Sequence, residues 1–243
     1  MKGYFLLFAG LLFFSTVHAQ FSDSMHYFAG FTSTGSINKT NTTSAYLLNN
    51  EVNLGVKRKD VSVSAAGAWV YGNQDKKLTN NDYNTSLYAD LYKTFPHFNY
   101  WGLFTYSSSY SLKINNRFQE GAGIAYNIID KDKLRFNLSD GILYENSDIY
   151  TSDTVRTVYF TFRNSLRLML HASWKDIIVF DGTGFLQNSL NYSNDYILKG
   201  DLSLAFNIRK WLSLKTQFTY NRISRTESEN VLFTYGLAIK KYF

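Results

Sequence analysis

The sequence predicts an all-β protein, a closed antiparallel transmembrane β-barrel of about 12 strands. The chain is rich in aromatic residues, at 18 %, and contains one proline, a residue that cannot donate a hydrogen bond inside a closed sheet. After residue 20, no segment is apolar over a length that would form a membrane helix. Apolar and polar residues instead alternate, as in strands of which one face meets lipid.

The first residues predict an exported protein. Met1-Lys-Gly carries one positive charge, an apolar run extends from Tyr4 to Phe14, and small residues lead to Ala19. This is the pattern of a signal peptide cleaved before Gln20, and the run is too short to span about 30 Å of hydrocarbon. We expect a signal peptide at 1–19, a barrel domain at 20–243, and a location in the cell outer membrane.

Alternation divides the rest of the chain into twelve expected strands. They cover residues 25–37, 43–56, 61–72, 82–95, 99–112, 117–128, 133–146, 155–170, 176–190, 195–208, 211–223 and 230–243. In the eighth strand, for example, Val158, Phe160 and Phe162 share one face. The last strand ends on the aromatic Phe243, which resembles the terminal signature of bacterial outer-membrane proteins.

The connections between these strands support the strand number. In bacterial barrels both termini are periplasmic, so the even-numbered connections are short and the odd-numbered ones are longer. The longest expected connections, 73–81, 147–154 and 224–229, are all odd-numbered. The alternation of short and long connections and the even strand number favour twelve strands. A barrel of ten or fourteen strands would mean that one hairpin has been misassigned.

Three segments in the middle of the chain resemble a known family. They are Gly102-Leu-Phe-Thr-Tyr106, Phe118-Gln-Glu-Gly-Ala-Gly-Ile-Ala-Tyr126 and Asp130-Lys-Asp-Lys-Leu134. They are similar to the salt-stress-induced outer-membrane protein family, a bacterial domain of unknown function, and the resemblance extends over about 25–243. It implies a monomeric barrel without an assigned activity. Two residues depart from the family pattern: Glu120 replaces an apolar residue, and Lys241 interrupts the alternation of the last strand.

Charged residues on the polar faces are the candidates for the lining of the lumen. They are Glu51, Asp90, Arg135, Glu145, Arg163, Arg167, Asp181, Lys199, Asp201, Lys215 and Lys240. The two signs are nearly balanced, whereas a charge-selective pore shows rings of one sign. We therefore expect these charges to pair and to leave a narrow interior. Arg167 and Asp181 are expected opposite each other across one hairpin, Asp201 and Lys215 diagonally across another, with at least one pair in contact.

Two functions fit this pattern best: a structural or stress-related envelope protein, or a narrow passive diffusion channel. A surface-binding or adhesion barrel that acts through its extracellular loops is the alternative, and a lipid-modifying enzyme of the outer membrane is a weaker one. Such an enzyme needs a serine with a histidine base near the outer leaflet. His26, His97 and His171 all map to the periplasmic end, so we expect no enzymatic activity.

The sequence contains no cofactor or metal motif. Asp130 and Asp132 lie in a turn where solvation is the ordinary explanation, and too few ligands surround them for calcium. Gly121 and Gly123 lie inside a strand, where glycine makes room for a neighbouring aromatic ring or marks a bulge. No basic stripe indicates nucleic-acid binding. The expected partners are outer-membrane lipids and the barrel-assembly machinery. Aromatic residues near strand ends are interpreted as membrane-interface girdles, with sugar stacking as the alternative.

Asp140 does not fit the pattern, because it shares the lipid-facing parity of its strand. A charge in the hydrocarbon is costly, and Gly141 follows directly, which often marks a bulge. The hypothesis is that the ladder is irregular at 139–141, turning Asp140 from lipid or placing it against a polar neighbour. The rival interpretation is a regular strand with Asp140 outward, either protonated or covered by a partner.

Overall fold

The computed structural model describes residues 27–242 except 59, 96 and 153–154. The expected signal peptide, His26 and Phe243 lie outside the described residues. The strands are β1 (Tyr27–Lys39), β2 (Ser44–Arg58), β3 (Val61–Gln74), β4 (Lys77–Phe95), β5 (Phe98–Ser109), β6 (Ile114–Lys131), β7 (Leu134–Tyr150), β8 (Arg156–Trp174), β9 (Ile178–Ser189), β10 (Tyr196–Arg209), β11 (Leu212–Ile223) and β12 (Ser228–Tyr242). A short 3₁₀ turn, η1 (Ser224–Thr226), precedes β12. Over the described ranges, no helix has the length and apolar character needed to span a membrane.

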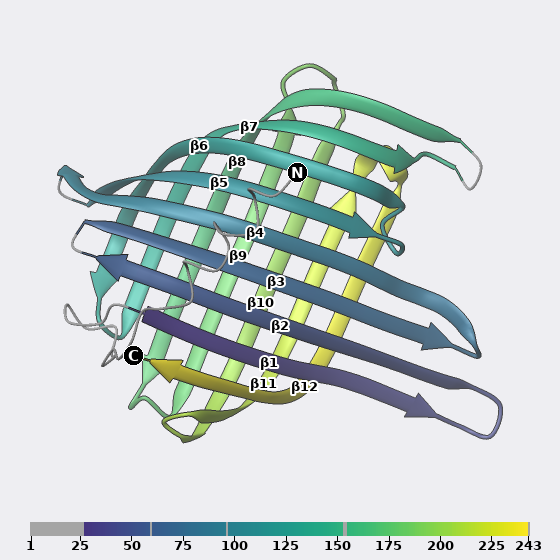
Figure 1. Ribbon diagram of the computed structural model, residues 1–243, viewed down its shortest axis with the longest axis horizontal. Helices are drawn as coiled ribbons and strands as arrows, with labels where there is room; N and C mark the ends of the chain where they lie inside the picture. The colour runs from purple at the N-terminus through teal and green to yellow at the C-terminus, as the bar shows by residue number, and fades with distance from the viewer. Residues whose placement is uncertain (1–26, 59, 96, 153–154, 243) are drawn as a thin grey trace, which may run out of the picture.

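Each strand pairs antiparallel with its neighbours, and β1 pairs with β12, which closes the barrel. Figure 1 shows the strongly inclined strands, with the start of β1 and the end of β12 at the same end of the barrel. We call this the terminal end and the opposite one the loop end. Residues 28–35 of β1 pair with residues 235–242 of β12, and this pairing closes the sheet on itself, as a structure surrounded by lipid requires. The predicted fold and strand number are confirmed.

Alternation places apolar side chains outside. In β12, Val231, Phe233, Tyr235, Leu237 and Ile239 are all exposed on the outer face, whereas the inward Thr234 is buried. β8 follows the same rule, since Val158, Phe160 and Phe162 are exposed while the inward Thr161 and Arg163 are fully buried. Because the side-chain period is two, the register of each pair fixes which residues reach the lumen.

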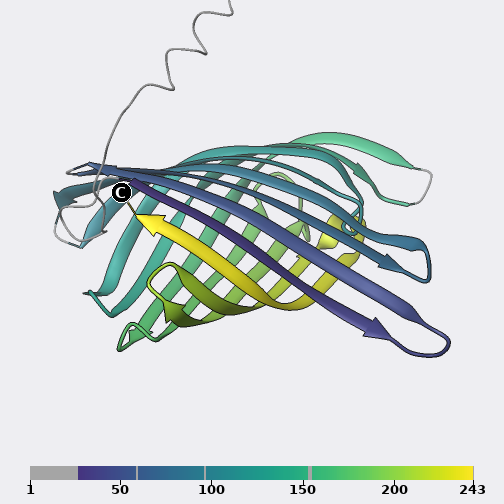
Figure 2. The same cartoon turned by 60° about the horizontal axis from the view of Figure 1, so that its bottom comes forward.

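The connections at the terminal end are turns of two or three residues, as predicted. At the loop end one expectation is wrong. The predicted long connection at 73–81 is a tight turn at Asp75 and Lys76, whose φ angles of 50° and 64° match a two-residue hairpin turn. The paired strands therefore continue further than expected. In Figure 2 several hairpins extend well beyond the middle of the barrel at the loop end.

Glycines on the inner faces of β6 and β7 make room for one aromatic ring. A Cβ atom added to Gly123 would lie 2.6 Å from Cζ2 of Trp101, and one added to Gly141 would lie 2.4 Å from the same atom. Trp101 is nearly buried and its Nε1 donates to the carbonyl oxygen of Ile124 at 3.2 Å. The interpretation as space for an aromatic side chain agrees with this packing at Gly123. At Gly121 it is wrong, because an added Cβ atom would instead meet the carbonyl oxygen of Ile142 and the side chain of Leu143.

Candidate functional site in the barrel lumen

The lumen contains two adjoining cavities. The mouth cavity, about 720 Å³, opens near the turns of the terminal end and is lined by residues that include Lys57, Asp90, His97 and Arg135. The central cavity, about 580 Å³, reaches from mid-lumen toward the loop end. Tyr88, Arg167, Met169, Asp181 and Thr183 line both cavities. The two volumes therefore meet at this ring of residues.

Hydrogen bonds cross the lumen and narrow it. Gln119 on β6 donates from Nε2 to Oε1 of Gln187 on β9 at 3.2 Å. Arg167 on β8 donates from Nη2 to the hydroxyl oxygen of Tyr88 on β4. Neither pair of strands is adjacent in the sheet, so these bonds run through the interior. Side chains, and not the strand number alone, set the width of the lumen.

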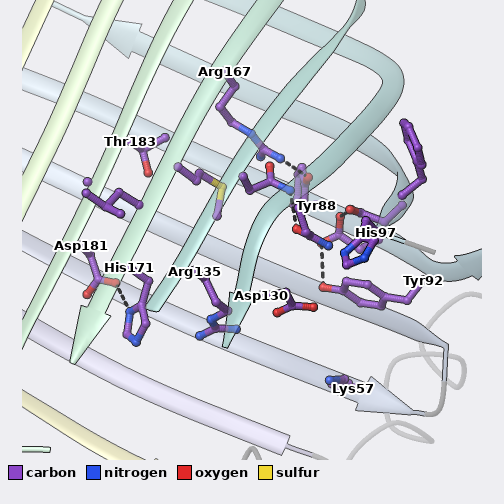
Figure 3. A pocket seen from close by; sticks show the side chains of 18 of the residues that line it. Lys57, Tyr88, Tyr92, His97, Asp130, Arg135, Arg167, His171, Asp181 and Thr183 are labelled. Carbon is purple, nitrogen blue, oxygen red and sulfur yellow. Dashed lines mark hydrogen bonds and ion pairs between the residues drawn. The ribbon is translucent and has the colours of Figure 1, made fainter. Parts of the chain in front are cut away.

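Arg167 lies at the junction of the two cavities and is held by aromatic rings. Its guanidinium carbon is 4.8 Å from the ring centroid of Tyr88 and 5.9 Å from that of Trp101. Its Nε donates to Oγ of Ser139 at 2.9 Å. Guanidinium groups stack favourably on aromatic faces. Arg167 is therefore held by rings and hydroxyl groups, and over the described ranges no carboxylate lies within 4.0 Å of it. Figure 3 shows it pointing from β8 toward Tyr88.

The expected ion pair between Arg167 and Asp181 does not form, because the register of the β8–β9 pairing differs from the expected one. Arg167 lies opposite Phe185, and Asp181 lies opposite His171. Oδ1 of Asp181 is 2.6 Å from Nδ1 of His171, as Figure 3 shows. The physical reason is the position of the hairpin turn, which lies at residues 175–177 and not at Trp174, because Trp174 itself pairs with Ile178.

The second expected pair does not form either. Asp201 lies opposite Thr219, whose hydroxyl donates to Oδ1 at 2.9 Å, and Lys215 lies opposite Ala205. The diagonal neighbours of Asp201 on β11 lie two residues from Thr219, whereas Lys215 lies four residues from Thr219. In the described part of the chain, neither Arg167 with Asp181 nor Asp201 with Lys215 makes an ion pair within 4.0 Å. The predicted contact is wrong for both pairs.

A buried charge network fills part of the lumen toward the loop end. Glu145 and Arg163 form a two-point ion pair, and both side chains are fully buried. Arg163 also contacts Oδ1 of Asp195 at 3.0 Å, and Arg225 contacts Oδ2 of Asp195 at 2.7 Å. Asp195 belongs to the connection between β9 and β10, and Arg225 to η1. The network therefore fastens two loop-end connections to the barrel wall.

An apolar cluster lies beside this network. Its members are inward-facing or come from the connection at 110–113, and none is more than 9 % exposed: Leu112, Ile114, Ile149, Tyr159, Ile197 and Ile223. Tyr159 joins the two groups, since its hydroxyl donates to Oε1 of Glu145 at 2.7 Å. The ring of Tyr159 also lies 4.0 Å below the guanidinium of Arg225. Together the cluster and the network fill part of the lumen on this side.

The structure distributes the predicted lining residues among these features. Asp90 and Arg135 line the mouth cavity, and Arg167 and Asp181 line both cavities. Glu51, Lys199, Asp201 and Lys215 line the central cavity. Glu145 and Arg163 belong to the buried network, and Lys240 donates to Oδ1 of Asn207 at 3.2 Å.

Sequence reasoning missed Arg117, Asp195 and Arg225. Arg117 shares the inward parity of Gln119, and this parity could have found it. Asp195 was placed at the start of a strand but lies in a connection, so alternation could not predict its direction. The same holds for Arg225 in η1.

Asp140 is exposed on the outer face and accepts a hydrogen bond from Nδ2 of Asn164 at 2.7 Å. The β7–β8 pairing is interrupted at residues 140 and 141 but resumes in the same register, and the β6–β7 pairing is continuous there. The ladder is therefore irregular at this point and Asp140 lies against a polar neighbour, as the hypothesis expected. The irregularity is a gap in the β7–β8 pairing and not a bulge, because no extra residue is inserted, and Asp140 stays on the outer face.

The described residues show no arrangement for acyl-transfer or metal chemistry. Across residues 27–242, apart from 59, 96 and 153–154, no group of three His, Cys, Asp or Glu side chains could hold a metal ion. His97 and His171 both line the mouth cavity at the terminal end. Within the described ranges, no serine hydroxyl is hydrogen-bonded to either histidine.

The closed sheet, its apolar outer face and its polar interior define the class: a porin-like β-barrel of the outer-membrane type. The chain belongs to DUF481, a family of proteins of unknown function, whose model matches residues 31–239. A comparison with curated proteins finds no match.

Solved structures share the fold at low sequence identity. The translocator domain of the autotransporter NalP from Neisseria meningitidis is 13 % identical, with a TM-score of 0.50 over 96 % of this chain and 92 % of that one. The NanC porin is 8 % identical, with a TM-score of 0.51 over 89 % of this chain and 99 % of that one.

Proposed function

We propose that the protein is an outer-membrane barrel that lets small polar solutes diffuse through its lumen. The observation that carries the proposal is the continuity of the mouth and central cavities, which share five lining residues. A twelve-stranded barrel lies between small barrels filled by side chains and the open porins. The cross-lumen bonds of Gln119 and Arg167 limit the path to small solutes.

In this proposal the signal peptide directs export, and the terminal end faces the periplasm. Outer-membrane lipids surround the apolar face, and the barrel-assembly machinery inserts the chain. A single barrel contains the whole lumen, so we propose a monomer. Cross-linking in native membranes would test this state, since a ladder of higher species would contradict it.

Single-channel recording in planar bilayers tests the channel. We expect discrete current steps from the refolded chain. Thr183 lines both cavities, so Thr183→Trp should lower the conductance at least about twofold by narrowing the path. The control is Leu204→Trp, because Leu204 is exposed on the outer face and is not among the residues that line the two cavities. A folded barrel that carries no current would overturn the channel.

A structural, stress-related envelope role is the second candidate. The apolar cluster and the buried charge network favour it, because both occupy the lumen at the loop end. A silent barrel, together with membrane defects under high salt in cells that lack the protein, would support this role. We propose neither adhesion nor catalysis: the loop-end connections contain two to six residues, and His97 and His171 lie at the other end.

A further inference from the structure

Arg117 on β6 has an unsatisfied donor at the central cavity. Only 1 % of its side chain is exposed, and it lines this cavity. Its Nε donates to Oγ of Ser147 at 3.0 Å and lies 3.5 Å from Oε1 of Glu145. Its Nη2 is buried and has no hydrogen-bond partner among the described residues. A buried charged donor without an acceptor is costly, so this nitrogen indicates a missing partner.

Glu145 cannot supply that partner, because its oxygens are already occupied. Oε1 accepts from Ser147, Tyr159 and Arg163, at 2.9, 2.7 and 3.1 Å. Oε2 accepts from Gln119 at 2.6 Å and from Arg163 at 2.8 Å. Two carboxylate oxygens provide about four acceptor positions.

Lys199 on β10 is a second cation on the same cavity. It lines the cavity together with Arg117. The positive charges of Arg117 and Arg163 and the negative charges of Asp201 and Glu145 all act on it. In the described ranges Lys199 makes no hydrogen bond or ion pair through its side chain. Asp201 lies two residues along the same face and offsets part of this charge, although its Oδ1 accepts from Thr219.

In the group made of the buried network with Arg117, Lys199 and Asp201, the cations exceed the anions by one. The cations are Arg117, Arg163, Lys199 and Arg225, and the anions are Glu145, Asp195 and Asp201. The excess is local, because the charged side chains that line the whole cavity are four of each sign. The other charged side chains that line the cavity are Glu51, Asp82, Arg167, Asp181 and Lys215. Asp82 accepts hydrogen bonds from Ser109 and Ser111, and Asp181 pairs with His171.

We infer that the central cavity binds one small oxyanion group, a carboxylate or a phosphate, between Nη2 of Arg117 and Nζ of Lys199. Guanidinium and ammonium donors suit such oxygens, and the cavity of about 580 Å³ has the size of a small-molecule site. The inference rests on the proposed function, since the solute reaches the site along the same lumen. It assigns the solute class: small molecules that carry an acidic group.

Calorimetric titration of the refolded full chain in detergent, with inorganic phosphate and separately with acetate, tests the site. We expect saturable binding of at least one of them, weakened about tenfold or more by Lys199→Gln. Lys199→Arg should retain binding. Lys39→Gln is the matched control, because Lys39 is exposed at the end of β1 and should bind as the unaltered chain does.

Phosphate and acetate distinguish the two ligand classes. The anion that binds with the higher affinity identifies whether the site prefers a phosphate or a carboxylate group. Absence of binding to the unaltered chain, or equal binding by Lys199→Gln, would overturn the site. Should Lys199→Gln not refold, Arg117→Lys is the second variant and should also weaken binding. A barrel that binds phosphate but conducts no current would refute the channel alone, and one that conducts but binds neither anion would refute the site alone.

Discussion

Arg163 donates two hydrogen bonds to Glu145, from Nε to Oε2 at 2.8 Å and from Nη2 to Oε1 at 3.1 Å. Both side chains are fully buried in the lumen. Paired hydrogen bonds of this kind are among the strongest in proteins. The loop end of the barrel is therefore held by a contact that no solvent screens.

Loss of this carboxylate should be severe. Glu145→Leu leaves Arg163 and Arg117 without their shared anion, and breaking a buried pair costs about 3–5 kcal/mol. Urea unfolding in lipid vesicles should show that loss. Glu51→Gln is the control, since Glu51 is half-buried and accepts from Asn53 at 2.9 Å, and should cost less than about 1 kcal/mol. Equal stabilities of the two variants would contradict the network.

Asp195 should control the mobility of the connection between β9 and β10. It contacts both Arg163 and Arg225, and charge-assisted bonds contribute about 1.5–3 kcal/mol each. Asp195→Ala should therefore speed amide hydrogen exchange at residues 190–195 by more than about tenfold. Asp75→Ala, at the β3–β4 turn, should leave that exchange unchanged. Unaltered exchange in Asp195→Ala would show that the contacts do not hold the connection.

The space beside Trp101 predicts a glycine requirement at Gly141. A Cβ atom there would lie 2.4 Å from Trp101 and 2.5 Å from the carbonyl oxygen of Ala122. Gly141→Ala should lower the free energy of unfolding by about 1–3 kcal/mol. Gly184→Ala is the control, because a Cβ atom added to Gly184 would have no other atom within 4 Å. A tolerated Gly141→Ala would show that the strands separate easily here.

The charge of Asp140 on the lipid-facing surface should lower the stability of the barrel, and replacement by asparagine should restore it. Asp140→Asn keeps an acceptor for Asn164 and removes a charge from the lipid-facing surface. It should raise the free energy of unfolding by up to about 2 kcal/mol, since acids in the hydrocarbon cost less than the 2–4 kcal/mol of cations. Asp132→Asn, in the turn between β6 and β7, should have no such effect. A loss of stability on Asp140→Asn would indicate that the carboxylate has a charged partner.

The sequence predicted the barrel and its strand number because alternation with a period of two is a local property. Residues such as Phe233 and Thr234 reveal their faces without knowledge of their partners. Register is different, since it depends on where each hairpin turns. A turn centred near residue 176 and not 174 moved the partner of Arg167 from Asp181 to Phe185.

The buried network was less predictable for a related reason. Glu145 and Arg163 were expected on the inner face, and their strands are neighbours. Asp195 and Arg225 reach them from irregular connections, where no period determines the direction of a side chain. Contacts across the lumen, such as Gln119 with Gln187, depend on the curvature of the whole sheet.

The bond from Arg167 to Tyr88 shows that two properties of the barrel depend on different parts of the chain, namely its closure and the width of its lumen. The backbone ladder determines whether the chain inserts and closes, while a few side chains that bridge the interior determine what fits inside. Under the proposed channel function, a single substitution at such a bridge changes the permeability without new strands or loops. Barrels with the same outline can then differ in the solutes they admit.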